Sequence, residues 1–293
     1  MLIAVTLVAA EPANIPDLVN QLTAGLANPL RPITHLGPGA VDLIVEAEDV
    51  ASLRQTVHDA LDGLAVDVCV QPAEGRRKRL LIADMDSTII GCECLDELAD
   101  FAGVKAEVSA ITERAMRGEI GFEGALRERV GMLRGLPLTA LQACFDQRVR
   151  LNPGARTLLA TMDAQGARCV LVSGGFEFFT SRVAAQAGFH ADRANRLIAD
   201  GEVLTGEVGE PILGREAKLE ALREEAAGLD LDLSQTLAVG DGANDLAMIT
   251  AAGLGVAYRA KPLVAAQAHA RIDHTDLTSL LYFQGYAASD FRA

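Results

Sequence analysis

From residue 79 onward, short apolar runs alternate with longer stretches that have helical spacing. Each run is nearly continuous in apolar residues, as strands covered on both faces are. The runs are 80–83, 168–172, 236–239 and 254–257, and the helical stretches are 153–165, 177–187, 215–227 and 243–252. This alternation predicts an α/β fold built on a doubly wound, Rossmann-like parallel sheet. In such sheets the functional site lies beyond the carboxyl ends of the strands.

Two insertions interrupt the alternation. Residues 93–150 have helical periodicity and contain no strand long enough to join the sheet. Because they directly follow the first strand of this region, we expect a helical cap over its carboxyl end. Residues 197–212 predict a small hairpin around a turn at Asp200 and Gly201.

The first 73 residues show a different order of elements. Strands are predicted at 2–9, 41–47 and 64–70, a weaker strand near 31–36, and helices at 13–26 and from Asp49 or Ser52 through Leu61. The resulting βαββαβ order is the ferredoxin-like pattern. It resembles the small amino-acid-binding (ACT-type) regulatory domains, in pattern alone, since no residue identifies a ligand. Whether such a domain binds an amino acid or only mediates assembly, for example as a homodimer, stays open.

A polar segment, residues 71–79, separates the two regions and ends in four basic residues. A solvated linker is favoured over a binding patch, because four cations are few in so acidic a chain. We therefore expect one domain at 1–73 and a second at 74–293, which carries the cap at about 93–150.

The net charge of the 293 residues is −14, which argues against a nucleic-acid partner, because binding to a polyanion needs clustered cations. Five cysteines without a Cys-x-x-Cys pair argue against a disulfide framework and for a reducing, cytoplasmic location. No apolar run reaches the length of a membrane span. The apolar residues 1–10 lack the basic residues that begin a signal peptide, so we expect a buried strand there.

Two acidic turns follow predicted strands. Asp84 and Asp86 follow the first apolar run in the sequence Asp-Met-Asp-Ser-Thr, and Asp241 and Asp245 follow the third in Gly-Asp-Gly-Ala-Asn-Asp. Either turn alone could be an ordinary polar turn after a strand. If the two strands are neighbours, however, the carboxylates converge, and their charges repel unless a cation relieves them. Together the turns predict a site for Mg²⁺, which prefers oxygen ligands.

A possible phosphate site lies between these turns. Ser173, Gly174 and Gly175 follow the second apolar run and precede a helix. Glycine-rich turns and helix N-termini bind phosphate through backbone amides, although this tripeptide alone is more typical of a tight turn. Lys218 would ordinarily be a solvated surface lysine, but it falls where a phosphate site would need a cation.

In this order, the four segments resemble the haloacid-dehalogenase superfamily of aspartyl-phosphate phosphatases, over about residues 79–260. Within the superfamily the chain is most similar to the phosphoserine phosphatases. Glu93, in Gly-Cys-Glu-Cys, matches that family's substrate glutamate, and residues 122–137 match its cap segment, with Phe122 and Arg129. An N-terminal regulatory-type domain is also similar to many bacterial members.

The resemblance implies a mechanism. Asp84 would be the nucleophile and Asp86 the general acid and base, with Mg²⁺ held by Asp84, Asp241 and the backbone carbonyl of Asp86. The implied substrate-binding residues are Glu93, Arg129, Ser173, Gly174, Lys218 and Asn244, and the supporting residues are Asp245, Met116, Phe122 and Gly175.

Several of these residues have a specific implied task. Asn244 and Asp245 would orient Lys218 or water around the metal. Met116 and Phe122, which otherwise are typical of helix core, would close the pocket against water.

The cap would select the substrate. Arg129 would pair with a carboxylate and Glu93 would accept from an ammonium, a combination that selects an amino acid. From the residues alone, Arg129 has a second interpretation, an ion pair with Glu123 or Glu128 on its own helix.

The implied function is hydrolysis of O-phospho-L-serine to L-serine and phosphate, the last step of L-serine biosynthesis. One alternative is a phosphatase or phosphotransferase for another small phosphomonoester, such as phosphohomoserine. Another is a non-catalytic, amino-acid-sensing protein on a phosphatase scaffold. The complete set of Asp84, Asp86, Lys218 and Asp241 argues against the scaffold, which needs none of them.

Overall fold

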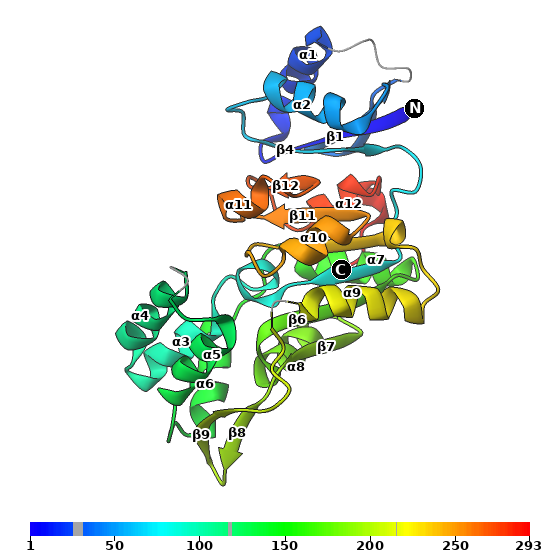
Figure 1. Cartoon of the computed structure of the whole chain (residues 1–293). Coiled ribbons are helices and arrows are strands. Elements are labelled where there is room, and N and C mark those ends of the chain that lie inside the picture. Colours follow the sequence, from blue (N-terminus) through cyan, green and yellow to red (C-terminus); the bar gives the residue numbers. More distant parts are fainter. Residues whose placement is uncertain (26–31, 117–118, 215) are drawn as a thin grey trace.

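The computed structural model describes residues 1–25, 32–116, 119–214 and 216–293, and the side chain of Met116 lies outside the described part. A single ten-stranded sheet runs through the molecule in the order β2-β3-β1-β4-β12-β11-β10-β5-β6-β7 (Figure 1). Among these residues, no helix is both long and apolar enough to cross a lipid bilayer.

Six parallel strands form one half of the sheet. They are β5 (Leu80–Ala83), β6 (Arg168–Phe176), β7 (Ala191–Asn195), β10 (Thr236–Gly240), β11 (Leu254–Tyr258) and β12 (Ala270–Ile272). The predicted parallel sheet is confirmed, and its four apolar runs are β5, β6, β10 and β11. The sequence pattern did not predict β7 and β12, because β7 is a polar edge strand and β12 has only three residues.

Helices cover both faces of this half. Along β5, Leu81 and Ala83 belong to one apolar core and Leu80 and Ile82 to another, as alternation along a strand requires. The first core includes residues of α7 (Ala155–Ala164), α8 (Glu177–Ala187) and α12 (Ser279–Phe283), and the second includes residues of α9 (Ala217–Gly228), α10 (Leu246–Ala251) and α11 (Pro262–Ala265). The sheet is therefore doubly wound.

The two predicted insertions pack against each other. Residues 93–150 contain α3 (Cys94–Ala102), α4 (Lys105–Met116), α5 (Phe122–Gly131) and α6 (Leu138–Arg148), and the hairpin consists of β8 (Leu197–Asp200) and β9 (Val203–Val208). Leu204 in β9 accepts from the backbone N–H of Gly135 and donates to the carbonyl of Leu136, at 2.8 and 2.9 Å. Helices and hairpin thus form one lobe beside the sheet (Figure 1).

The N-terminal residues form an antiparallel unit with a core of its own. Its elements are β1 (Leu2–Ala9), α1 (Ile15–Gly25), β2 (Thr34–Gly37), β3 (Ala40–Glu46), α2 (Val50–Ala60) and β4 (Val66–Pro72). Asp49, rather than Ser52, caps α2, by accepting from the Ser52 backbone N–H at 2.8 Å. The parts of the predicted helix and strand at residues 26 and 31 lie outside the described residues.

The segment 71–79 is docked in part: residues 72, 74, 75, 77 and 79 are exposed, as expected of a solvated linker, whereas the other residues of the segment are buried or half-buried. Gln71 and Lys78 are only 6% and 7% exposed. Gln71 donates to the carbonyl of Phe283 at 2.7 Å, and Arg76 pairs with the buried Asp42 at 2.7 Å. The buried carboxylate holds a cation that the composition of the segment would place in solvent.

Candidate active site

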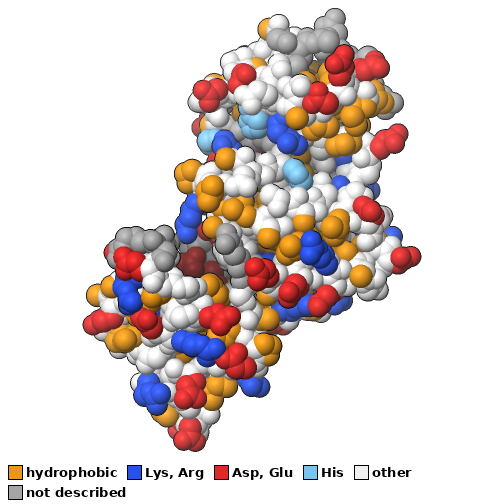
Figure 2. All heavy atoms as spheres, viewed as in Figure 1, with side chains coloured by type: hydrophobic (Ala, Val, Ile, Leu, Met, Phe, Trp, Pro, Cys, Tyr) orange, Lys and Arg blue, Asp and Glu red, His pale blue; other side chains and the backbone are white. Residues whose placement is uncertain are grey.

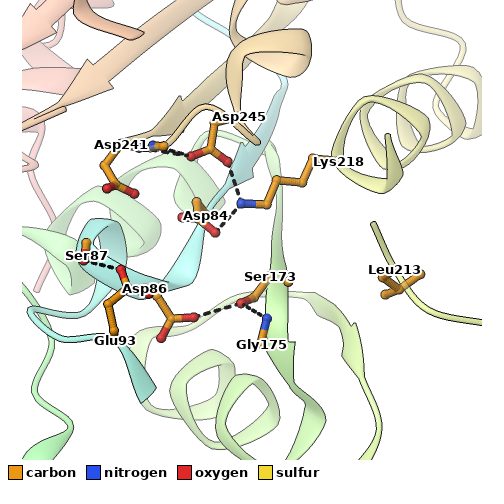
Figure 3. A network of polar contacts seen from close by, with 12 residues as sticks. Asp84, Asp86, Ser87, Glu93, Ser173, Gly175, Leu213, Lys218, Asp241 and Asp245 are labelled. Atoms are coloured by element: carbon orange, nitrogen blue, oxygen red, sulfur yellow. Dashed lines mark hydrogen bonds and ion pairs between the residues drawn. The ribbon is translucent and has the colours of Figure 1, made fainter. Parts of the chain in front are cut away.

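The acidic turns converge because their strands are neighbours. Asp84 follows β5 and Asp241 follows β10, and the Asp84 backbone N–H donates to the carbonyl of Val239 at 3.0 Å. Carboxylate oxygens of Asp84, Asp241 and Asp245 all lie within 4.8 Å of one another. Figure 3 shows these three side chains pointing toward one another.

Lys218 joins this cluster from α9. Its side chain is 3% exposed, and its Nζ lies 2.5 Å from an Oδ1 of both Asp84 and Asp245. Burial opposes its charge, but Asp245 and Asp84 outweigh burial and raise the pKa of Lys218. The lysine is therefore a buried cation between two carboxylates, not the solvated lysine of the ordinary interpretation.

Asp245 holds the second turn together as well as the lysine. Its Oδ2 accepts from the backbone N–H groups of Asp241 and Gly242, at 3.1 and 2.9 Å. The expectation that Asp245 orients Lys218 agrees with this contact. Asn244 Oδ1 lies beside the position that a Cβ on Gly242 would take, and its expected role stays a prediction.

The carboxylate cluster fits a divalent cation. Burial and the charge of Asp245 raise the pKa of Asp84 well above its usual range, with Lys218 opposing them. Burial, Asp245 and Glu93 raise the pKa of Asp241 to about 6. These shifts mark an excess of negative charge, and a hard cation with oxygen ligands such as Mg²⁺ would relieve it.

The side chain of Asp86 lies apart from the three-carboxylate cluster. Its Oδ2 accepts from Ser173 Oγ at 3.0 Å, and its Oδ1 accepts from the backbone N–H of Cys94 at 2.8 Å. Burial and the charge of Glu93 raise its pKa to about 6. Such a carboxyl group can both donate and accept a proton near neutral pH.

Backbone strain at Ser87 shapes this turn. Ser87 has φ 58, in the left-handed region that non-glycine residues rarely adopt. Its Oγ donates to Glu93 Oε1 at 2.6 Å. This contact places the carboxylate of Glu93 beside Asp86, as Figure 3 shows.

The Ser-Gly-Gly segment faces Asp86 from β6. Ser173 is buried, and its Oγ also accepts from the Gly175 backbone N–H at 2.9 Å. A Cβ on Gly175 would lie 3.0 Å from Asp86 Oδ2 and Ser173 Oγ, so a larger residue would press on both side chains. The predicted phosphate loop and the predicted acid–base carboxylate therefore meet.

Asn195, which the sequence analysis missed, positions this loop. It is buried at the end of β7, and its Nδ2 donates to the carbonyls of Gly174 and Leu213 at 2.9 and 3.3 Å. Its Oδ1 accepts from the Leu213 backbone N–H at 2.7 Å. The signal that could have identified Asn195 is a polar residue at the end of a strand, but β7 itself was not predicted.

The helical lobe contributes Phe122 and Arg129. The Phe122 ring lies over Gly174, since its Cζ would be 3.4 Å from a Cβ there. Arg129 is half-buried and donates to the carbonyl of Ala125 at 3.2 Å, with Thr112 Oγ1 at 3.5 Å from its Nη1. Met116 ends α4, and its side chain lies outside the described residues.

Among the described residues, Arg129 forms no ion pair with Glu123 or Glu128 of its own helix. Glu128 instead pairs with Arg114, at 2.9 Å. Burial lowers the pKa of Arg129, whereas Asp96 and Glu93 act in the opposite direction. The acidic groups that face the guanidinium thus come from the start of α3 and the turn before it, on the side of Asp86.

Comparisons with known proteins agree with this geometry. Residues 81–250 match the family model of haloacid dehalogenase-like hydrolases. A phosphoserine phosphatase of Polaromonas sp. is 44% identical over 75% of this chain and 95% of its own length. One of Streptomyces coelicolor is 41% identical over 87% of this chain, but the match spans only 62% of that longer protein.

Solved structures give the same result. A haloacid dehalogenase family hydrolase from Salmonella enterica serovar Typhi superposes with a TM-score of 0.87 and 30% identity, over 96% of this chain and 98% of that one. A substrate-bound phosphoserine phosphatase superposes with a TM-score of 0.66 and 37% identity, over 71% and 98%. The chain therefore belongs to the haloacid dehalogenase-like hydrolases and, within them, to the phosphoserine phosphatase family.

Proposed function

We propose that the protein hydrolyses O-phospho-L-serine to L-serine and phosphate through a phosphoaspartate on Asp84, the last step of L-serine formation. One observation carries the proposal. Lys218 is buried between Asp84 and Asp245, beside Asp241 and at the carboxyl ends of two neighbouring strands. A buried cation next to carboxylates that would hold Mg²⁺ is an arrangement that, with the metal bound, would neutralise an incoming phosphate.

In the first step, an Oδ of Asp84 attacks phosphorus while the bond to the serine oxygen breaks. Lys218, Ser173 Oγ and the Gly174 backbone N–H hold the phosphoryl oxygens. Asp84, Asp241 and the backbone carbonyl of Asp86 would hold Mg²⁺, with the carboxylate of Asp245 close enough to join or support them. When bound, Mg²⁺ offsets the repulsion between carboxylate and phosphate.

Asp86 moves the protons. In its protonated form it gives a proton to the serine oxygen as the bond between that oxygen and phosphorus breaks. As a carboxylate it then takes a proton from the water that attacks the phosphoaspartate, which releases phosphate. Its pKa of about 6 and its contact with Ser173 support both roles.

The helical lobe selects the substrate. Arg129 pairs with the serine carboxylate, and Glu93 accepts from the ammonium group. Phe122 lies over the phosphate loop, where it excludes water together with Met116. Asn244 contacts the phosphoryl group from the second acidic turn. We assign the helical lobe, about residues 93–150, the role of a cap.

The remaining parts of the proposal concern organisation. We assign residues 1–73 to a ferredoxin-like, ACT-type domain and 74–293 to the phosphatase domain, because β1 to β4 have the βαββαβ order and a separate core. An exposed N-terminal unit of this kind is suited to homodimer formation. Five free cysteines support a reducing, cytoplasmic setting.

Phosphate release from a panel of phosphomonoesters, with and without Mg²⁺, tests the mechanism. The panel contains phosphoserine, phosphohomoserine and phenyl phosphate. We expect phosphoserine to be the best substrate, activity to need Mg²⁺, and Asp84→Asn to abolish turnover of every ester. Asp17→Asn, an exposed aspartate on α1, is the matched control. Full activity of Asp84→Asn would refute the covalent route, and a preference for phosphohomoserine would refute the substrate.

A further inference from the structure

A cleft of about 860 Å³ lies where the N-terminal unit meets the phosphatase core. Its walls are residues 51–68, from α2 to β4, and residues 265–274, from the end of α11 to the turn after β12. Figure 2 shows histidine and basic side chains gathered at this junction. The cleft shares no residue with the active site described above, and its volume suits a small metabolite.

Arg54 lines the cleft and has unused donor capacity. Its Nη2 donates to the carbonyl of Val70 at 3.1 Å. Its Nε is buried and has no hydrogen-bond partner among the described residues. A buried guanidinium nitrogen without an acceptor is costly, and an anionic oxygen would satisfy it.

Two half-buried histidines add further donors. His269 Nδ1 accepts from the Gly255 backbone N–H at 2.9 Å, so the neutral ring carries its proton on Nε2. His58 lies across the cleft on α2. Burial lowers the pKa of both rings, and Arg54 lowers both further, together with Arg271 at His58. Both rings are thus shifted toward the neutral form, in which each imidazole keeps one N–H donor.

The acidic residues of the walls are either engaged or at the rim. Asp67 accepts from the backbone N–H groups of residues 273–275 and from Thr275 Oγ1, at 2.5 to 3.3 Å. Asp273 pairs with Arg271 at 3.3 Å. Asp59 and Asp62 are exposed, and Asp59 accepts from Gln55 Nε2 at 2.7 Å.

We infer that this cleft binds the carboxylate or phosphate group of a small metabolite, with Arg54, His58 and His269 as its donors. The site is separate from the phosphatase centre, and it spans the junction between the two units. Its existence does not depend on the reaction proposed above.

Histidine NMR can test this site, because all five histidines are described and none lies in the active site. Inorganic phosphate and acetate are titrated separately into the full chain at constant ionic strength. We expect the ring signals of His58 and His269 to move saturably in the direction of protonation. His35 and His190 lie outside the cleft and should not move.

Variants give the test its specificity. We expect Arg54→Gln to weaken the apparent affinity at least about tenfold, which corresponds to loss of one charge-assisted hydrogen bond. Arg156→Gln, an exposed arginine of α7, should change nothing. If Arg54→Gln fails to fold, His58→Gln should weaken the response of His269 instead.

The outcomes separate the ligand classes. Saturation by phosphate alone, by acetate alone or by both identifies a phosphate site, a carboxylate site or a general oxyanion site. Parallel, non-saturating movement of all five histidines would overturn the inference. An unchanged titration in both Arg54→Gln and His58→Gln would do the same.

Discussion

Lys218 lies between Asp84 and Asp245. The structure predicts that replacing each aspartate by asparagine has a different effect on the stability of the protein. Asp245 is fully buried and accepts from Lys218 and from two backbone N–H groups. In Asp245→Asn, the amide must turn an N–H group toward another donor, and Lys218 loses a partner. Breaking a buried ion pair costs roughly 3–5 kcal/mol of unfolding free energy.

Asp84 differs because its charge is unfavourable in the metal-free protein. Its folded pKa is raised well above 3.8, first by burial and then by Asp245. A raised pKa means that this carboxylate lowers stability increasingly as the pH rises above its unfolded value. Asp84→Asn removes that penalty, so we expect the melting temperature at pH 7 to stay the same or rise.

Thermal unfolding in EDTA measures both variants. A domain of this size loses about 2 °C per kcal/mol, so Asp245→Asn should lower the Tm by roughly 6–10 °C. The gap between Asp84→Asn and wild type should shrink as the pH falls toward 4, because the penalty is lost as the pH approaches the unfolded pKa of 3.8. Equal losses of Tm in the two variants would refute the assignment of Asp245 as the structural partner of Lys218.

Three further predictions concern catalysis. Arg129→Lys keeps the charge but loses the bidentate geometry, so KM for phosphoserine should rise about tenfold with phenyl phosphate kinetics unchanged; a rise for both esters would contradict a carboxylate contact. Because burial and Glu93 raise the pKa of Asp86 to about 6, Glu93→Gln should move the alkaline fall of kcat/KM for phenyl phosphate to lower pH. An unmoved profile would exclude Asp86 as the acid. Asn195→Ala leaves the Gly174 carbonyl without its donor, so kcat should fall for every ester. An unsatisfied buried group costs about 1–3 kcal/mol, so the Tm should fall by a few degrees. An unchanged kcat would reduce Asn195 to a structural role.

The parallel sheet could be predicted because local pattern and burial agree along it. Each central strand is apolar on both faces, and each apolar run gives way to polar residues such as Asp84, Ser173 or Asp241. β7 could not be predicted in this way, because an edge strand with Asp192 and Arg193 is half-buried and has no apolar run. Asn195 was missed together with its strand.

Contacts between distant segments were beyond the sequence pattern. Lys78 reads as one more cation of a basic linker, and only the folded chain brings it to the carbonyls of Gly75 and Ser234, at 3.0 and 2.8 Å. Likewise, the pattern offered Arg129 a partner at Glu128, but Arg114 of another helix takes that carboxylate. Residue type fixed which groups could carry charge, while the tertiary fold decided how they paired.

The second acidic turn shows how glycine decides the chemistry of this site. A Cβ on Gly240 would overlap Asp245 Cγ, because it would lie closer than non-bonded carbon atoms approach. Gly240 has no positive φ that would otherwise require glycine, so the need is for space beneath the carboxylate. Only that space lets Asp245 fold back to accept from Gly242 and reach Lys218, and Lys218 is in turn held against Asp84. The glycine before Asp241 thus permits the contact that brings the lysine to the nucleophile.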